Sequence, residues 1–483
     1  MLLKSYLLVI CLCWAPLRVA ADSTTDLEAI DTFLQAEFSR NNLPGLAVTI
    51  TQGEEVVFEQ AYGVGVSAQT PFFIASLSKS MTALAVMQLV EAGQIDLDAP
   101  VQRYLPEFQL ADDAAAAQIS VRHLLNQTSG LADSGFPEGQ LPQPETLAGR
   151  MESLQSAEVV SAPGAAFHYF NPNYAVLARL VEVVSGEPFD SYLATSVFAP
   201  LQMTQTGSFV TAQAAREQVP GLAPGHLMAY GLPFSVGEMD GLLIGSGGVV
   251  STAEDMARYL IMQANGGATQ GRRLVSADSL SLMHTPPADG DYGMGWMRTT
   301  ENGVTVLEHT GILSAYYADM ILAPDTHTAV ILLYNLNGLA PAMFAFSNIH
   351  QGVVALLTGG TPAEGGLSLP QWGILAAGLT VGGVTLAVRS LLGLSRWRSA
   401  HRETPFWRLL PGIVWAFTPG IALLALPALV TAFSGRAFSY VQLARNMPDV
   451  LLWLGLCAIL GAINGITRLA SRLRRPVTAT ASR

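Results

Sequence analysis

Three long apolar segments in the last part of the sequence limit most strongly what this chain can fold into. They lie approximately at 371–394, 411–433 and 447–467. Each is long enough to cross a bilayer core of about 30 Å as a helix that rises about 1.5 Å per residue. Buried core helices are the alternative. Because 50% of the chain is hydrophobic and only 13% is charged, we expect three transmembrane helices within 371–483.

The arginines between these segments predict how the membrane region is oriented. The loop at 395–410 contains four arginines, the loop at 434–446 contains two, and five more follow residue 467. Cytoplasmic loops are enriched in Arg and Lys, so the first loop and the C-terminus are expected in the cytoplasm. The body of the protein would then lie on the periplasmic or extracellular side of the cell membrane, joined by a linker at 361–370.

The N-terminus carries a second targeting signal. Residues 1–21 begin with one lysine, continue through an apolar run and end in Val-Ala-Ala, which is the layout of a secretory signal peptide. An uncleaved anchor helix is the alternative. Two of the three cysteines lie in this segment and the third lies in the membrane region. The exported body at 22–360 therefore has no cysteine with which to form a disulfide.

The charge distribution excludes one class of partner. The chain has a net charge of −12, although the residues after 370 contain twelve arginines and only two acidic residues. The negative charge lies in the body, whereas nucleic-acid binding requires a basic surface. The eight histidines show no metal-ligand spacing such as His-Glu-x-x-His, so we expect no metal and no other cofactor.

The body is predicted to have an α+β fold. Apolar periodicity predicts helices at 26–38, 76–91, 120–126, 174–184, 251–264 and 340–357, and strands at 46–51, 55–60, 303–309, 316–322 and 328–334. Strands lie near both ends with helices between them, so one sheet should join the two ends of the body. Ser251-Thr-Ala-Glu254 is a capping-box pattern and predicts the start of one helix.

A serine and a lysine provide the first candidate chemistry. Lys79 is the only lysine after the signal segment, and Ser76 precedes it by three positions. Residues three apart on a helix share a face, so the two side chains can touch. A serine hydroxyl needs a base to attack a carbonyl, and a desolvated lysine can be neutral enough to act as one. On this motif alone, a solvated helix residue is an equally good interpretation of Lys79.

Two further sequence elements carry suitable side chains. Tyr169 and Asn171 stand just before a predicted helix. Tyr169 could relay a proton, while Asn171 could bind a substrate carbonyl or hold Lys79. A loop tyrosine packed on the helix is the alternative. His309-Thr310-Gly311 ends a predicted strand, where a glycine allows the substrate backbone to approach closely.

These three elements, in this order, resemble the β-lactamase-related serine hydrolases, which include class C β-lactamases, D-stereospecific peptidases and esterases. The resemblance covers roughly 26–357 and includes supporting sequences at 119–131, 247–252 and 292–296. It implies a β-lactamase/DD-peptidase-like sandwich, in which helices flank an antiparallel sheet beside a helical subdomain.

The resemblance also implies a role for each candidate residue. Ser76 would be the acylated nucleophile, and Lys79 and Tyr169 would be the base and proton-relay pair. The backbone N–H groups of Ser76 and Ile312 would form the oxyanion hole. Asn171 would position the substrate beside the strand edge.

The strand edge departs from the pattern of class C β-lactamases. These enzymes carry a lysine where this chain has His309, and that cation helps to hold the carboxylate of the drug. A mostly neutral histidine favours an esterase or a peptidase over an antibiotic hydrolase. Relatives with this histidine often have a second glycine after Gly311, whereas Ile312 is bulky and is expected to narrow the site.

From the sequence we therefore expect a membrane-anchored, extracytoplasmic serine hydrolase. Its substrate would be a small-molecule or cell-envelope ester or amide, including D-amino-acyl compounds, and its other partner would be the lipid bilayer. The alternative is a non-catalytic, penicillin-binding-like sensor or binding protein coupled to the membrane helices. The intact Ser-Lys-Tyr set disfavours this alternative.

Overall fold

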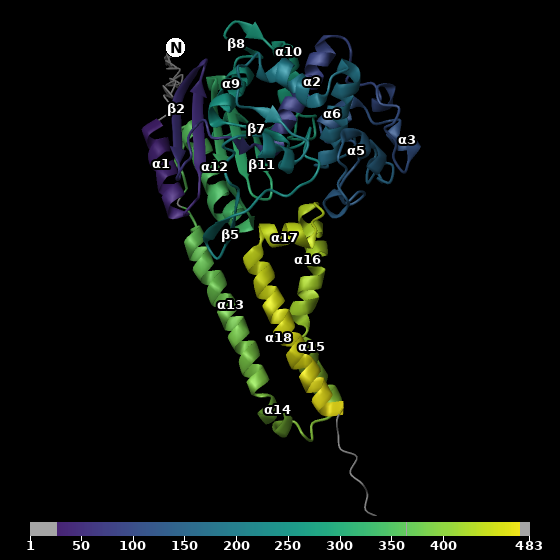
Figure 1. Cartoon of the computed structure of the whole chain (residues 1–483), viewed down its shortest axis with the longest axis vertical. Coiled ribbons are helices and arrows are strands. Elements are labelled where there is room, and N and C mark those ends of the chain that lie inside the picture. The colour runs from purple at the N-terminus through teal and green to yellow at the C-terminus, as the bar shows by residue number, and fades with distance from the viewer. Residues whose placement is uncertain (1–26, 364, 474–483) are drawn as a thin grey trace, which may run out of the picture.

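The computed structural model describes residues 27–363 and 365–473. It shows a mixed body that stands on a group of long helices (Figure 1). The predicted signal peptide at 1–21 lies outside the described residues.

The body contains helices on both sides of its main sheet. Its α-helices are α1 (Leu27–Arg40), α2 (Ser78–Glu91), α3 (Asp113–Ala116), α4 (Val121–Leu125), α5 (Leu147–Leu154), α6 (Asn171–Ser185), α7 (Phe189–Leu193), α8 (Ala212–Gln218), α9 (Ala253–Ala264), α10 (Ala277–His284), α11 (Leu339–Pro341) and α12 (Ser347–Leu357). A short 3₁₀ helix, η1 (Ala75–Leu77), precedes α2.

The strands form one large sheet and three small ones. They are β1 (Leu46–Gln52), β2 (Glu55–Tyr62), β3 (Phe72–Phe73), β4 (Gly207–Ser208), β5 (His226–Ala229), β6 (Leu232–Ser235), β7 (Val249–Ser251), β8 (Ala268–Thr269), β9 (Arg272–Arg273), β10 (Met297–Glu301), β11 (Val304–Ile312), β12 (Tyr317–Ala323), β13 (Thr328–Tyr334) and β14 (Leu336–Asn337).

The large sheet joins the two ends of the body, as the sequence predicts. Its strand order is β10-β11-β12-β13-β1-β2, and its neighbouring strands are antiparallel, with Ile50 opposite Val330 where β1 meets β13. The edge strand β10 was not predicted, because its Met-Arg-Thr-Thr-Glu sequence is polar and partly exposed. The α+β prediction is confirmed.

Both faces of the sheet are buried, and alternating side chains serve two cores. Val330 and Leu332 of β13 pack with α1 and α12 on one face. Ile331 and Leu333 belong to the core that α2 and α9 form on the other face. Successive side chains of β13 point to opposite faces, and both faces are buried. The sequence of β13, Thr-Ala-Val-Ile-Leu-Leu-Tyr, is therefore almost continuously apolar.

Two predicted helix starts need correction. Helix α6 begins at Asn171, three residues before its predicted start, because a proline in the first turn is compatible with a helix. Helix α9 is capped by Thr252, whose side chain accepts a hydrogen bond from Asp255 N. Ser251 is instead the last residue of β7, so the capping box that would start at this serine is wrong.

The remaining helices form the lower part of the molecule in Figure 1. They are α13 (Leu369–Leu392), α14 (Leu394–Ala400), α15 (Phe406–Trp415), α16 (Thr418–Ser434), α17 (Tyr440–Asn446) and α18 (Pro448–Leu473). By length and apolar composition, α13 and residues 448–472 of α18 could each span a membrane, and α15 with α16 would form a further, bent span. The chain segment Leu339–Leu357 passes the same test, but it is part of the body and its buried residues pack on the sheet.

The middle predicted segment is not one straight helix. Helices α15 and α16 meet at an angle of 47°. Pro419 lies in the first turn of α16, where it cannot donate the backbone hydrogen bond that would continue α15.

Candidate active site

Ser76 lies in a tight turn between β3 and α2. It is the central residue of η1, and the preceding residue, Ala75, has a φ of 51°. This left-handed conformation is uncommon for a residue other than glycine and is typical of functional turns. Strand β11 passes very close to the turn: a Cβ at Gly311 would lie 2.3 Å from Ile74 O. The glycine therefore allows the strand edge to lie beside the serine.

Lys79 points from the first turn of α2 to Ser76. Its Nζ donates hydrogen bonds to Ser76 Oγ, at 2.9 Å, and to the backbone oxygen of Ser246, at 2.8 Å. The lysine is fully buried, and this burial, followed by the charge of Arg436, holds its pKa well below the usual range. A lysine in this state can lose its proton near neutral pH and act as a base.

Tyr169 completes the cluster from the loop before α6. The Nζ atom of Lys79 lies 4.9 Å from the centre of the Tyr169 ring. Burial raises the pKa of Tyr169 to about 12, against the opposing effects of a hydrogen bond with Ser76 and of Arg436. The phenol therefore keeps its proton at neutral pH and is placed to donate it.

His309 faces the same cluster from β11. Its Nε2 lies 3.2 Å from Tyr292 Oη and its Nδ1 lies 2.8 Å from Thr310 O. Burial and the nearby Lys79 lower the pKa of His309 to about 3. The imidazole is therefore neutral at physiological pH, so it supplies no positive charge to the site.

The side chain of Thr310 points away from the cluster that His309 faces, because successive side chains of a strand point to opposite faces of the sheet. Its hydroxyl donates to Asp319 Oδ1 of β12 at 2.8 Å. Asp319 in turn lies 3.5 Å from His350 of α12. The Thr310 side chain thus supports the strand from the far face of the sheet, and only its backbone can meet a ligand beside Ser76.

Asn171 and Ile312 lie near this cluster with different surroundings. Asn171 is the first residue of α6 and is half-buried. Within the described residues, Lys79 bonds to Ser76 and Ser246 rather than to Asn171. Ile312 ends β11 with a 55% exposed side chain.

Several contributors were not found from the sequence. Glu238 fixes the turn after Ile312, since its carboxylate accepts hydrogen bonds from Ser314 N and Oγ and from Ala315 N. Ser246 acts through its backbone oxygen, which no sequence motif identifies. Arg436 comes from the segment between α16 and α17 and binds Asp133, 303 positions earlier in the chain.

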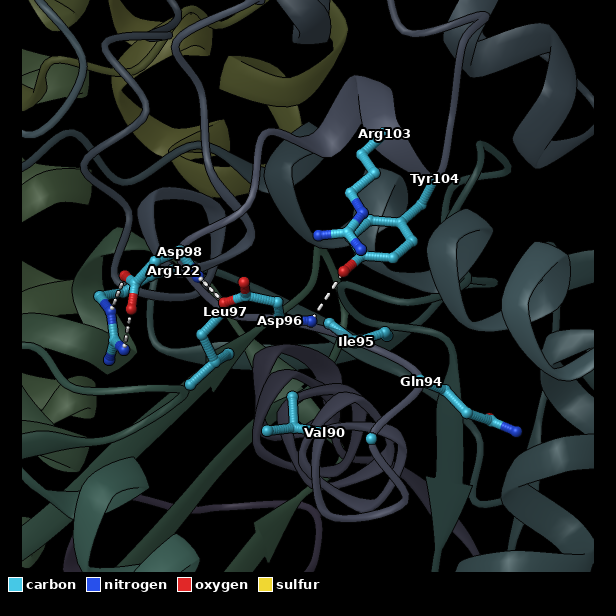
Figure 2. Close-up of a pocket in the computed structure, with 10 residues that line it drawn as sticks. Val90, Gln94, Ile95, Asp96, Leu97, Asp98, Arg103, Tyr104 and Arg122 are labelled. Carbon is cyan, nitrogen blue, oxygen red and sulfur yellow. Dashed lines mark hydrogen bonds and ion pairs between the residues drawn. The ribbon is translucent and has the colours of Figure 1, made fainter.

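A separate pocket of about 460 Å³ lies beyond the C-terminal end of α2 (Figure 2). Arg122 donates to both carboxylate oxygens of Asp98, and Tyr104 Oη accepts a hydrogen bond from the backbone N–H of Asp96. Helix α2 has 14 residues and is therefore roughly 21 Å long. Ser76 lies at its other end, so this pocket is not part of the candidate active site.

Curated proteins with similar sequences include a penicillin-binding protein and protein flp. Penicillin-binding protein 4 of Amycolatopsis lactamdurans is 29% identical over 324 residues, which cover 63% of this chain and 84% of that protein. Protein flp of Staphylococcus aureus (strain NCTC 8325 / PS 47) is 25% identical over 320 residues, 64% of this chain. The match spans 63% of the length of protein flp.

Solved structures share the fold. An octameric penicillin-binding protein homologue from Pyrococcus abyssi has a TM-score of 0.59 and 25% identity, covering 70% of this chain and 79% of that one. A D-stereospecific amidohydrolase from Streptomyces sp. has a TM-score of 0.54 and 22% identity, covering 64% and 94%. EstCE1, a hydrolase with promiscuous acyltransferase activity, has a TM-score of 0.56 and 21% identity, covering 70% and 98%.

The body of this chain also matches a family model directly. The model described as Beta-lactamase matches residues 28–352, which is more than half of the chain and ends before α13. This range contains Ser76, Lys79, Tyr169 and His309. The chain therefore belongs to the β-lactamase family of serine hydrolases, penicillin-binding proteins and their relatives.

Proposed function

We propose that the protein is a membrane-anchored, extracytoplasmic serine hydrolase that cleaves ester or amide substrates through an acyl-enzyme on Ser76. The observation that carries this proposal is the contact between Ser76 Oγ and the buried Lys79 Nζ, at 2.9 Å. In the described part of the chain, the Nζ atom is bonded to oxygens of two serines and to no carboxylate. A buried lysine in such surroundings is costly to keep charged, which suits a base.

In the proposed reaction, neutral Lys79 accepts the proton of Ser76 Oγ while this oxygen attacks the substrate carbonyl. The backbone N–H groups of Ser76 and Ile312 stabilise the resulting oxyanion. The tetrahedral intermediate then expels its leaving group, which takes a proton from Tyr169, and Lys79 returns its proton to the phenolate. Water hydrolyses the acyl-enzyme by the same proton transfers in reverse, with Asn171 positioning the substrate.

An esterase or D-amino-acyl peptidase fits the site better than a true β-lactamase. The neutral His309 places no cation at the strand-edge position where class C β-lactamases hold the carboxylate of the drug, so any cation for a carboxylate must come from another element. Two proteins that share the fold, EstCE1 and the D-stereospecific amidohydrolase, have names that describe these other kinds of activity.

The membrane placement rests on helix length and on the arginine distribution. Helices α13, α15 with α16, and α18 would cross the bilayer, with the arginine-rich loop after α13 and the C-terminus in the cytoplasm. Residues 1–21 would export the body. Of two reporters fused after Arg483, the one that works only in the cytoplasm should be active. Activity of the one that works only outside the cytoplasmic membrane would contradict this orientation.

The catalytic proposal is tested by covalent labelling of the full-length protein in detergent. A fluorophosphonate probe should modify the wild type at Ser76 and should not modify Ser76→Ala. Lys79→Arg keeps a long cationic side chain but no base, and should label about 10²- to 10⁴-fold more slowly. If neither this probe nor penicillin labels the wild type, a non-catalytic binding or sensor protein becomes the better interpretation.

The substrate class is tested with p-nitrophenyl esters, D-alanyl peptides and nitrocefin. We expect esters or D-alanyl peptides to have the highest kcat/KM. Nitrocefin as the best substrate would contradict the argument from His309.

A further inference from the structure

The segment between α16 and α17 contacts the candidate active site. We refer to its residues 435–439 as the arginine loop. Arg436 Nε and Ala437 N both donate to Asp133 Oδ2, each at 2.9 Å. Gln140 Nε2 donates to Phe438 O at 3.3 Å. Figure 1 shows this end of α16 and helix α17 directly beneath the body.

The Arg436 guanidinium lies next to the catalytic cluster. Its central carbon is 5.4 Å from the centre of the Tyr169 ring, and Lys79 Nζ is 4.9 Å from the same centre. The charge of Arg436 is among the causes that lower the pKa of Lys79 and that oppose the rise in the pKa of Tyr169. Arg436 is therefore electrostatically coupled to both residues that would move protons.

Part of the guanidinium remains free to bind a ligand. Within the described residues, its hydrogen bond is the one from Nε to Asp133, so neither terminal nitrogen is engaged. The side chain is 32% exposed, whereas that of Asp133 is 2% exposed. The other nearby carboxylate, Glu138, is paired with Arg150 at 2.8 Å. Asp133 thus orients the arginine from one side and leaves its two NH₂ groups open.

This arrangement suits recognition of a carboxylate. Two NH₂ groups in a fixed plane can bind both oxygens of a carboxylate, which gives strength and orientation together. The neutral His309 does not compete for such a group. Lys79 does not compete either, because its Nζ is bonded to Ser76 and Ser246.

We propose that Arg436 is a specificity-determining residue of the active site and binds a carboxylate of the substrate. This inference rests on the proposed hydrolase function and extends it: the preferred substrates are esters or amides that carry a free carboxylate. The membrane region would then supply the substrate-binding cation, whereas the family domain supplies the nucleophile and base.

The test uses pairs of substrates that differ only in charge. The mono-p-nitrophenyl esters of succinic, glutaric and adipic acid each carry a free carboxylate, and their methyl esters are the neutral partners. The three chain lengths allow for the unknown reach from Ser76 to the guanidinium. The measured quantity is the ratio of kcat/KM for the acid to that for its methyl ester, using the full-length protein in nanodiscs.

In Arg436→Gln, we expect this ratio to fall at least tenfold for at least one chain length. Arg436→Lys keeps the charge but loses the two-point geometry, so the ratio should fall less. The ratio cancels changes in the reactivity of Ser76 and Lys79, because these affect both substrates. Labelling of each variant by the fluorophosphonate probe shows that Ser76 is still in place.

Arg445→Gln is the matched control. Arg445 lies in the same part of the membrane region and bonds to Gly237 O and Ser314 Oγ of the body, so its loss removes one charge and one docking contact. The ratio should stay at the wild-type value. An unchanged ratio in Arg436→Gln, or an equal fall in Arg445→Gln, would overturn the proposal. If the wild type cleaves neither ester and resists labelling, the hydrolase function itself is wrong.

Discussion

Ser76 and Lys79 interact across one helical turn, and their chemistry depends on whether the lysine carries a proton. Burial and Arg436 both favour the neutral form of Lys79. Tyr169 stays protonated, because burial raises its pKa to about 12. One group can thus accept a proton while its neighbour donates one, which is the division of roles that acyl transfer requires.

The pH dependence of the reaction should report Lys79. Since only the neutral lysine can accept the proton of Ser76, kcat/KM should rise with pH through the lowered pKa of Lys79 and then level off. Removing the positive charge in Arg436→Gln should move this rise to higher pH. At pH values below the rise, each decrease of one pH unit should lower kcat/KM for a neutral ester about tenfold, in the wild type and in Arg436→Gln.

The matching measurement is a pH profile of kcat/KM with p-nitrophenyl methyl glutarate. Arg436→Lys retains the charge, so its profile should follow that of the wild type. If the pH profile of Arg436→Gln coincides with that of the wild type, Arg436 does not set the charge state of Lys79.

At the scale of elements, the site depends on how closely β11 approaches the turn at η1. A Cβ at Gly311 would meet Ile74 O at 2.3 Å and Ala75 Cβ at 3.2 Å. The two elements therefore cannot keep their spacing if the glycine is replaced. Behind the strand, Thr310, Asp319 and His350 link β11 and β12 to α12.

Gly311→Ala should push β11 away from Ser76. Because a displacement of about 1 Å can cost about 10²-fold in rate, we expect kcat/KM to fall about 100-fold with the best ester. Gly290→Ala, in the loop before β10, is the control, since a Cβ at this position would meet no atom within 4 Å beyond its chain neighbours. Equal activities of the two variants would contradict the role given to Gly311.

His350 should stabilise the sheet in a pH-dependent way. Burial opposes its charged form, but hydrogen bonds and charge interactions with Asp319 and Glu308 raise its pKa to about 10. The imidazolium is thus present in the folded protein at neutral pH. Its stabilising effect is complete below the ordinary pKa of about 6.5 and is lost as the pH rises towards 10.

His350→Gln should therefore lower the Tm by about 5 °C at pH 6, as expected for the loss of one partner of a buried ion pair. The difference from the wild type should shrink as the pH approaches 10. Thermal unfolding of the full-length protein at several pH values measures both effects, with His401→Gln, directly after α14, as the control. A difference that does not change with pH would argue against a charged His350.

Sequence patterns predicted five of the six strands of the large sheet and part of the site. Apolar runs identified β1 and β13 because both of their faces are buried, whereas the polar edge strand β10 has no such run. The contact between Ser76 and Lys79 could be predicted from their spacing, because one helical turn brings residues three apart together. Arg436 could not be found in this way, since its contact with Asp133 arises only when distant segments fold against each other.

At the scale of the whole molecule, the helices below the body are attached to it at several points. Leu369, the first residue of α13, is fully buried and its N–H donates to Asn41 Oδ1. Asp449 at the start of α18 accepts hydrogen bonds from Trp372 Nε1 and from Tyr230 N. The predicted linker at 361–370 therefore ends in residues that are already packed against the body, rather than in a free tether.

Because the arginine loop docks on Asp133, the end of the family domain is not the end of the candidate active site. The family model ends at residue 352, but the side chains that contact Tyr169 include Arg436. If Arg436 has the proposed role, a body excised after Leu357 would keep Ser76 and Lys79 but lose this cation, and its substrate preference and pH response should both change. Replacement of residues 358–483 should accordingly change selectivity without any substitution in the region that the family model matches.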